Sequence, residues 1–281
     1  MIWNIVCDSS CDLSKHDFVS ECVNFETVPL RLQVGEREFV DDEQLNVPEL
    51  LAAMAEEKSA SSSACPSPGT FAQAFAKGDK TVCFTMTSSL SGTYNAAQMG
   101  REMALEENPE REICIIDSKA TAGMLVLLIH KAKELMEADT TGDFEGICNQ
   151  LRMYQASLRL SFTLENFDNL IKNGRMRPLV GTLLHSLGIH VIAEATTKGT
   201  IRVVDKARGE QKTYKALVQQ MCKNKDCTDA EVVISHCENP VGAEKLKAQI
   251  LADLPVKRVD IVSCRGLTSF YAMEKGLLVG Y

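Results

Sequence analysis

Short apolar runs that end in polar loops and lead into helical periodicity recur through the first half of the chain. Residues 2–6, 81–86 and 113–116 are short and apolar, and each run predicts a strand. Apolar residues at helical spacing follow the second and third runs and predict helices around residues 96–105 and 122–137. Strands that end in polar loops and continue into helices are typical of a parallel α/β layer.

Other elements interrupt this alternation. Residues 28–40 alternate around a Gly-Glu turn and predict a β-hairpin. Asn46 predicts the cap of a helix that has a proline in its first turn. Residues 61–71 are rich in Ser, Pro, Gly and Thr, so they predict a loop, with Ser67 as the cap of the next helix.

The pattern changes near Leu158, where a second series of strands and helices begins. Residues 189–197 and 200–207 alternate around a Lys-Gly turn and predict a second hairpin, so the sheet of this half should be mixed. Pro178 opens a further apolar helix. The remaining predictions are strands at 159–164, 231–236, 256–262 and 276–281, and helices at 167–172, 212–222 and 241–251.

Composition and charge exclude several classes of protein. The 281 residues can form one large domain or two of ordinary size. A formal net charge of −8 argues against a nucleic-acid-binding surface, which needs clustered Lys and Arg. The longest apolar stretch, 122–129, is far shorter than the ~20 residues of a membrane span. The amino terminus predicts a strand rather than a signal peptide, so we expect a cytoplasmic protein without stable membrane insertion.

The eleven cysteines indicate neither a metal site nor a redox site. The closest pairs, Cys7 with Cys11 and Cys222 with Cys227, lack the Cys-x-x-Cys spacing of such sites. A scattered, odd-numbered set fits a reducing compartment, where buried thiols act as small apolar side chains.

Residues 87–94 are the most informative stretch for function. They place four hydroxyl side chains and Gly92 between a buried strand and a helix. A helix amino end offers free N–H groups and partial positive charge, so this junction favours an anion such as a carboxylate or phosphate. A serine-rich helix cap without a ligand is the alternative. The hydroxyl residues are Ser88, Ser89, Ser91 and Thr93.

Two other predicted strand ends carry similar polar groups. Ser9 and Ser10 follow the first strand, and Asp117 and Ser118 follow the strand at 113–116. The carboxyl ends of parallel strands gather ligands at one edge of a sheet, so the convergence of these loops strengthens the prediction of an anion site. Asp8, beside the serines, is interpreted as a turn cap in preference to a metal ligand.

The chain contains five short segments at residues 8–13, 66–71, 88–94, 116–118 and 174–176. In their order and spacing, these segments resemble the DegV family of bacterial fatty-acid-binding proteins over essentially the whole chain. The resemblance implies two α/β domains: residues 1–157, a three-layer α/β/α domain with a mainly parallel sheet, and residues 158–281, with a mixed sheet. It also implies that a long-chain fatty acid lies between the domains. A separate ATP-dependent fatty acid kinase then phosphorylates its carboxylate, and the chain itself is no enzyme.

Carried over by position, the resemblance implies that Ser91, the N–H of Gly92 and Ser63 hold the lipid carboxylate. The family usually has Thr-Ser-Gln-Pro-Ser where this chain has Ser63-Ala64-Cys65-Pro66-Ser67, so two polar groups are missing. Many members carry a histidine near the carboxyl terminus, whereas this chain has none there. A replacement contact must come from Thr268, Ser269 or Tyr271, or be absent.

Further residues are expected to line the pocket or its entrance. The helix after Pro178 should supply part of an apolar wall, and Arg175 should form a structural ion pair in preference to a functional contact. No metal ion or cofactor is expected. The candidate lining residues are Ser9, Ser10, Thr93, Arg175, Leu179, Val180, Leu183, Leu184, Thr268, Ser269, Phe270 and Tyr271, with Phe71 less strongly indicated.

Two other functions fit parts of the pattern. A serine hydrolase or acyltransferase could use Ser91 at its strand-to-helix turn as a nucleophile, but the Gly-x-Ser-x-Gly signature is absent. Such an enzyme also needs a base, and His236 is the best-placed histidine. The second alternative is an interaction module that has lost the use of its pocket.

Overall fold

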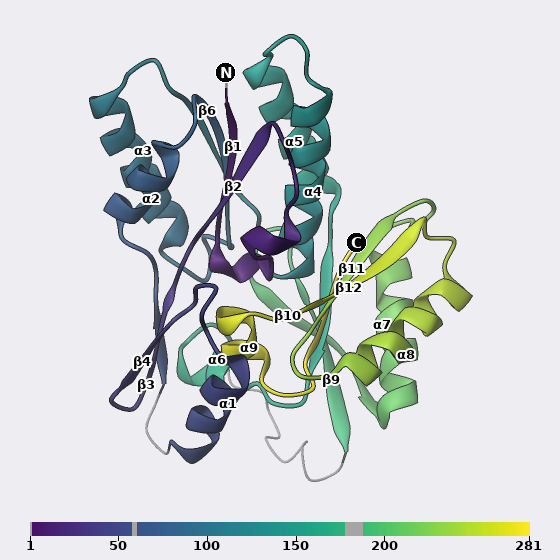
Figure 1. Cartoon of the computed structure of the whole chain (residues 1–281). Coiled ribbons are helices and arrows are strands. Elements are labelled where there is room, and N and C mark those ends of the chain that lie inside the picture. The colour runs from purple at the N-terminus through teal and green to yellow at the C-terminus, as the bar shows by residue number, and fades with distance from the viewer. Residues whose placement is uncertain (1, 58–60, 178–187) are drawn as a thin grey trace.

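Two sheets organise the chain, and their strands and helices bear out the predicted two-domain α/β fold (Figure 1). The structure is a computed structural model and describes residues 2–57, 61–177 and 188–281. The helix expected after Pro178, with Leu179, Val180, Leu183 and Leu184, lies outside the described residues.

The amino-terminal sheet was predicted to be mainly parallel, and all of its strand pairs are parallel. Its strand order is β2-β1-β6-β7. The two central strands are buried along their whole length, because helices cover both faces of the sheet. The strands are β1 (Trp3–Asp8), β2 (Val23–Val28), β6 (Lys80–Thr85) and β7 (Glu112–Asp117).

Helices cover this sheet on both sides and give the predicted three layers (Figure 1). On one side lie α2 (Pro68–Phe75) and α3 (Thr93–Glu107), and on the other α4 (Gly123–Ala138) and α5 (Phe144–Ser157). The prediction omitted α5. Its buried residues have helical spacing, but the intervening positions are so polar that the stripe is narrow: Phe144, Ile147, Cys148 and Leu151.

A small antiparallel sheet stands beside this layer, in the order β4-β3-β5. The predicted hairpin forms β3 (Arg31–Val34) and β4 (Arg37–Val40), and Asn46 caps α1 (Val47–Glu56) as expected. The prediction of an uninterrupted loop over 61–71 is wrong at β5 (Ser62–Ala64). β5 pairs with the edge of β3 that faces away from β4, where Leu32 stands opposite Ser63. This pairing makes a strand of residues that have no strand pattern of their own.

The carboxyl-terminal sheet is mixed, as predicted, with the order β10-β9-β8-β13-β11-β12. Among the described strands of this sheet, the neighbours β11 and β12 are parallel, and every other neighbouring pair is antiparallel. The strands are β8 (Leu160–Leu164), β9 (Ile189–Ala195), β10 (Ile201–Arg208), β11 (Glu231–His236), β12 (Arg258–Ser263) and β13 (Leu277–Gly280).

Helices α7 (Glu210–Asn224) and α8 (Pro240–Asp253) cover one face of this sheet (Figure 1). The short helix α6 (Asp168–Lys172) was predicted, whereas α9 (Gly266–Ala272) was not. The other short turns are 3₁₀ helices at Ser9–Cys11 and Lys15–Asp17.

Helix α4 joins the two sheets, because it packs on β1 and β6 and also on β11 and β13. Two glycines permit this close approach. A side-chain carbon on Gly123 would lie 2.6 Å from the carbonyl oxygen of Val233, and one on Gly280 would overlap the backbone of α4. One apolar core therefore runs from the first sheet into the second. The boundary between residues 157 and 158 stays a prediction.

Candidate functional site

A cavity lies between the two sheets, with an empty volume of about 800 Å³ that includes space open to solvent. The amino-terminal part of the chain supplies Leu30, Ser63, Met86, Thr87, Leu90, Ser91, Lys119, Ala120 and Thr121 to its wall. The carboxyl-terminal part supplies Leu160, Phe162, Leu164, Leu170, Arg175, Ala195, Gly199, Ile201, Leu267, Thr268, Tyr271, Ala272 and Leu278.

The second sheet supplies much of the apolar wall. Side chains alternate across a strand, so Leu277 and Val279 pack in the core under α7 and α8, whereas Leu278 faces the cavity. Leu160, Phe162 and Leu164 take the same cavity-facing positions on β8. This wall suits an extended hydrocarbon chain.

Three loops at the carboxyl ends of parallel strands meet beside the cavity, as the sequence predicts. The buried carboxylate of Asp8 accepts the N–H of Ser10 at 3.0 Å and that of Met86 at 2.6 Å, which ties the end of β1 to the end of β6. The N–H of Thr87 bonds to the carbonyl of Ala120, beyond the end of β7. Asp8 is therefore a turn cap, as interpreted from the sequence.

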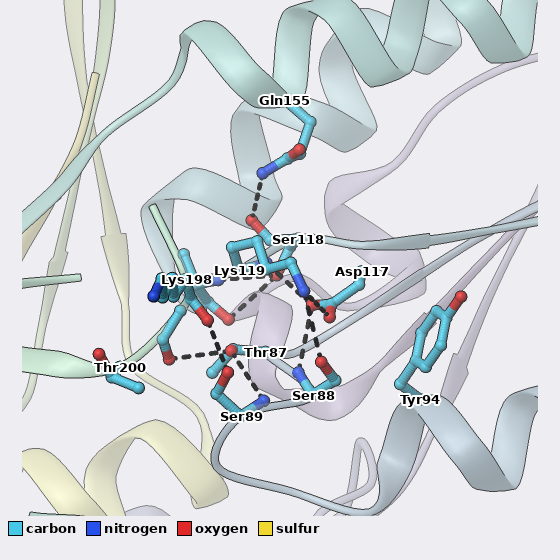
Figure 2. Close-up of polar contacts among 12 residues, drawn as sticks. Thr87, Ser88, Ser89, Tyr94, Asp117, Ser118, Lys119, Gln155, Lys198 and Thr200 are labelled. Carbon is cyan, nitrogen blue, oxygen red and sulfur yellow. Dashed lines mark hydrogen bonds and ion pairs between the residues drawn. The ribbon is translucent and has the colours of Figure 1, made fainter. Parts of the chain in front are cut away.

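Figure 2 shows how Asp117 holds the serine-rich loop. Its Oδ1 accepts the N–H of Ser88 at 3.1 Å, and its Oδ2 lies 2.5 Å from Lys119 Nζ. Burial alone would raise the pKa of Asp117, but the bonds from Lys119 and Ser88 hold that pKa below its usual value. Lys119 lines the cavity, and the sequence did not single it out; its position after a predicted strand end was the available signal.

Ser91 stands where β6 leads into α3. Its Oγ lies 2.8 Å from the hydroxyl of Thr93 and accepts the Thr93 N–H at 3.3 Å. Gly92 is the exposed residue that precedes α3, so its N–H lies at the positive end of a helix of four turns. A side-chain carbon on Gly92 would lie 3.6 Å from the sulfur of Cys65, so the loop that follows Ser63 lies against this turn.

Ser63 approaches the cavity from β5. Its Oγ lies 2.8 Å from the hydroxyl of Tyr271 on α9, and both residues line the cavity. Thr268 also lines it, and its buried hydroxyl has no hydrogen-bond partner in the described part of the chain. The structure thus brings Ser63, Ser91, Thr268 and Tyr271 to one cavity.

Arg175 lines the cavity as well, but the expected ion pair is wrong for the described residues. Its Nε donates to the carbonyl of Leu90 at 2.9 Å, and Nη1 donates to the carbonyl of Asn173. Among residues 2–57, 61–177 and 188–281, no carboxylate pairs with it. The guanidinium instead joins the segment after α6 to the residue before Ser91.

Several candidate lining residues lie behind the wall. Ser9 accepts the N–H of Leu30, and Ser10 donates to Asp8. Ser269 donates to the carbonyl of Cys264, and Phe270 is fully buried in a separate core that includes Leu30 and Leu32. These side chains support the loops rather than the cavity wall. The sequence alone cannot distinguish a side chain that supports a loop from one that contacts a ligand. Thr93 and Phe71 are also buried outside the lining.

Two more buried carboxylates support α9. Asp41 accepts the N–H groups of Gly266 and Leu267, each at 2.8 Å, and burial raises its pKa. Burial also raises the pKa of Asp12 to about 7. The N–H of Arg265 donates to Asp12 at 2.9 Å, which lowers this pKa in part. The nearby hydroxyls of Thr268 and Ser235 also lower it, although neither forms a well-directed hydrogen bond.

The described residues contain no group of three or more His, Cys, Asp or Glu side chains arranged to hold a metal ion. Within the same residues, every helix is too short or too polar to cross a membrane.

Among the described residues, no histidine bonds to Ser91, so the hydrolase alternative has no base there within this part of the chain. The bonds described for Ser91 involve Thr93. His236 stands elsewhere: its Nδ1 accepts the N–H of Asn239 at 3.2 Å, and its Nε2 lies 3.5 Å from Ser263. With Nδ1 as an acceptor, the neutral ring carries its proton on Nε2 and cannot take one from Ser263.

Comparisons with known proteins agree with this fold. A family model described as "Uncharacterised protein, DegV family" matches residues 2–277. A DegV domain-containing protein of Streptococcus pyogenes serotype M1 is 37% identical over 281 residues, covering 100% of this chain and 99% of the relative.

Two solved structures are similar over nearly their whole length. The Streptococcus pneumoniae Fatty Acid Kinase (Fak) B3 protein loaded with linoleic acid has a TM-score of 0.95 and 34% identity, covering 100% of this chain and 99% of that one. A DegV family protein from Eubacterium eligens loaded with heptadecanoic acid has a TM-score of 0.92 and 30% identity, covering 99% and 98%. From these matches and the shared two-sheet architecture, the chain belongs to the DegV family.

Proposed function

We propose that this protein binds a long-chain fatty acid in the cavity between its sheets and presents the carboxylate to a separate fatty acid kinase. The observation that carries the proposal is a largely apolar cavity whose lining includes the hydroxyls of Ser63 and Ser91. Family members at 34% and 30% identity were solved with linoleic and heptadecanoic acid, which supports a fatty acid as the ligand.

The proposed head-group site consists of Ser63, Ser91 and the N–H of Gly92. Ser91 and Gly92 stand at the amino end of α3, where partial positive charge favours an anion. A second hydroxyl lies 2.8 Å from each serine, that of Thr93 for Ser91 and that of Tyr271 for Ser63. A serine that accepts from this second hydroxyl keeps its own proton for the carboxylate.

Neutral donors suit presentation to a kinase. They orient the carboxylate without neutralising it, so one oxygen stays nucleophilic. That oxygen attacks the γ-phosphorus of ATP on the kinase, the bond from this phosphorus to the bridging oxygen breaks, and the products are acyl phosphate and ADP. In this proposal the protein is the lipid-carrying partner rather than the enzyme, and it works in the cytoplasm, where ATP is available.

The direct test is to extract the purified protein with organic solvent and identify the extract by mass spectrometry. We expect about one fatty acid per chain. An empty extract, combined with no binding of added oleate, would contradict the proposal. Treatment with an acyl ester and a fluorophosphonate probe tests the hydrolase alternative, because an acylated Ser91 would support that function instead.

A further inference from the structure

The contact between Ser63 and Tyr271 joins two distant segments at the cavity wall. Ser63 Oγ and the Tyr271 hydroxyl lie 2.8 Å apart, although 208 residues separate them in the sequence. Both side chains are half-buried and both line the cavity. The bond therefore lies where a ligand in the cavity can reach it.

The surrounding structure holds the tyrosine in place. Its ring packs edge-on against Phe270, with ring centroids 4.9 Å apart and an angle of 86° between the planes. Phe270 is fully buried, and its carbonyl accepts a bond from the side chain of Asn169 at 2.8 Å. Asp41 binds the first N–H groups of the same helix. Tyr271 thus presents its hydroxyl from a position fixed on several sides.

Hydrogen-bond chemistry gives this contact a direction. A serine hydroxyl has one proton and two acceptor lone pairs, and it rotates to suit its surroundings. A phenol is a stronger acid than an alcohol, so the phenol is the preferred donor when the two are paired. Ser63 then accepts from Tyr271, and its own proton is left to point at a group in the cavity.

We propose that Tyr271 is a positioning residue that acts through Ser63, directing the Ser63 proton toward the carboxylate of the bound fatty acid. This inference rests on the proposed function. In this proposal Tyr271 does not itself contact the carboxylate. It therefore differs from a third head-group ligand.

The test is a double-mutant cycle of Tyr271→Phe and Ser63→Ala with oleate as the ligand. Tyr271→Phe keeps the ring and its packing and removes only the hydroxyl. We expect it to weaken oleate binding about twofold to tenfold. In carbon-13 NMR, the bound carboxyl of [1-¹³C]oleate should titrate at a higher pH in this variant. In the Ser63→Ala background, the same change should have no further effect on either measurement.

Ser63→Thr provides a second variant, because it keeps a hydroxyl and should keep the dependence on Tyr271. Tyr214→Phe is the matched control. It removes a tyrosine hydroxyl that bonds to Glu210 at the same distance, 2.8 Å, away from the cavity. It should change neither oleate affinity nor the titration of the carboxyl.

Each outcome decides the inference. Equal losses from Tyr271→Phe with and without Ser63 would overturn it and make Tyr271 a direct ligand. No effect of Tyr271→Phe in the wild-type background would also overturn it. If the wild-type protein bound no oleate at all, the proposed function itself would fail, and this inference with it.

Discussion

The hydroxyl of Thr87 donates a 2.9 Å hydrogen bond to the carbonyl oxygen of Gly199, which lies 112 residues further along the chain. Gly199 has a φ of +76°, and a side-chain carbon on it would overlap the Thr87 hydroxyl, so the contact requires glycine. Ser89 reinforces it with a 2.6 Å bond to the carbonyl of Lys198 (Figure 2). The turn of the β9–β10 hairpin is thereby attached to the loop that leads to Ser91.

Thr87→Val tests this attachment. The change removes the donor to Gly199 and the acceptor of the Ser89 N–H, so two backbone groups lose their partner. We expect a loss of ~1–3 kcal/mol in the free energy of unfolding, and faster dissociation of bound oleate in stopped-flow measurements.

Thr213→Val is the matched control for this variant. The Thr213 hydroxyl also donates a 2.9 Å bond to a glycine carbonyl, that of Gly209, but at the start of α7 and outside the cavity lining. This variant should lose stability without releasing lipid faster. Equal dissociation rates for both variants would show that the attachment does not control lipid retention.

Ser91→Ala and Ser63→Ala should separate lipid binding from phosphorylation. Burial of about 14 methylenes at ~0.8 kcal/mol each contributes roughly 11 kcal/mol before association costs. One hydrogen bond to a charged group is worth only ~1.5–3 kcal/mol. Each variant should therefore still bind oleate, while kinase-coupled ATP turnover falls further because the head group is no longer aimed.

The measurements are oleate affinity by displacement of a fluorescent fatty acid and ATP turnover with the kinase at saturating lipid. Unchanged turnover in both variants would rule out the proposed head-group site. Complete loss of oleate binding in either variant would instead show that the head group, and not the tail, dominates affinity.

Asp12 makes stability depend on pH. Its pKa of about 7 in the folded protein lies above its ordinary value of 3.8, so the folded state binds the proton more tightly than the unfolded state. Protonation of Asp12 therefore makes its full contribution to the free energy of unfolding below pH ~4, and this contribution is lost as the pH rises to ~7.

Asp12→Asn should remove this dependence. An amide still accepts the N–H of Arg265, adds a donor near Ser235 and Thr268, and tolerates the φ of +56°. At pH 8 the variant should exceed the wild type by up to ~4 kcal/mol, because a tenfold change in a protonation constant corresponds to ~1.4 kcal/mol. At pH 4 the two should agree closely.

Urea unfolding at both pH values checks this prediction. The control is Asp205→Asn, on the exposed side of β10, where the carboxylate accepts a bond from the N–H of Lys206. This exposed substitution should have only a small effect on the free energy of unfolding. An Asp12→Asn protein that is less stable than the wild type at pH 8 would contradict the assigned direction.

The two hydrogen bonds of the Arg175 guanidinium should matter more for lipid retention than its positive charge. Its two bonds to the carbonyls of Leu90 and Asn173 need a guanidinium, which Lys cannot replace. We expect Arg175→Lys and Arg175→Ala to release oleate faster by similar factors, and the exposed Arg177→Ala to behave as the wild type. Full retention of lipid by the Lys variant would instead point to attraction of the head group by charge.

Much of the fold could be predicted because it depends on local pattern. Apolar runs and periodic helices predicted most of the strands and helices, and Asn46 and Ser67 cap helices where expected. The parallel order of β1, β6 and β7 brought the polar strand ends together as anticipated. Helices α5 and α9 and strand β5 were missed. Helix α5 has a narrow apolar stripe, and β5 is a strand only because it pairs with β3.

The sequence by itself determined the α/β alternation, the mixed second sheet and the hydroxyl-rich turn before α3, because each is encoded in residues close together in the chain. Only the tertiary structure decided which hydroxyls reach the cavity. Ser9 and Ser10 turn inward to support neighbouring loops, whereas Ser63 meets Tyr271 and Thr87 meets Gly199. A hydroxyl bonds to whichever group folding brings within 3 Å or so, and that group can lie a hundred or more residues away.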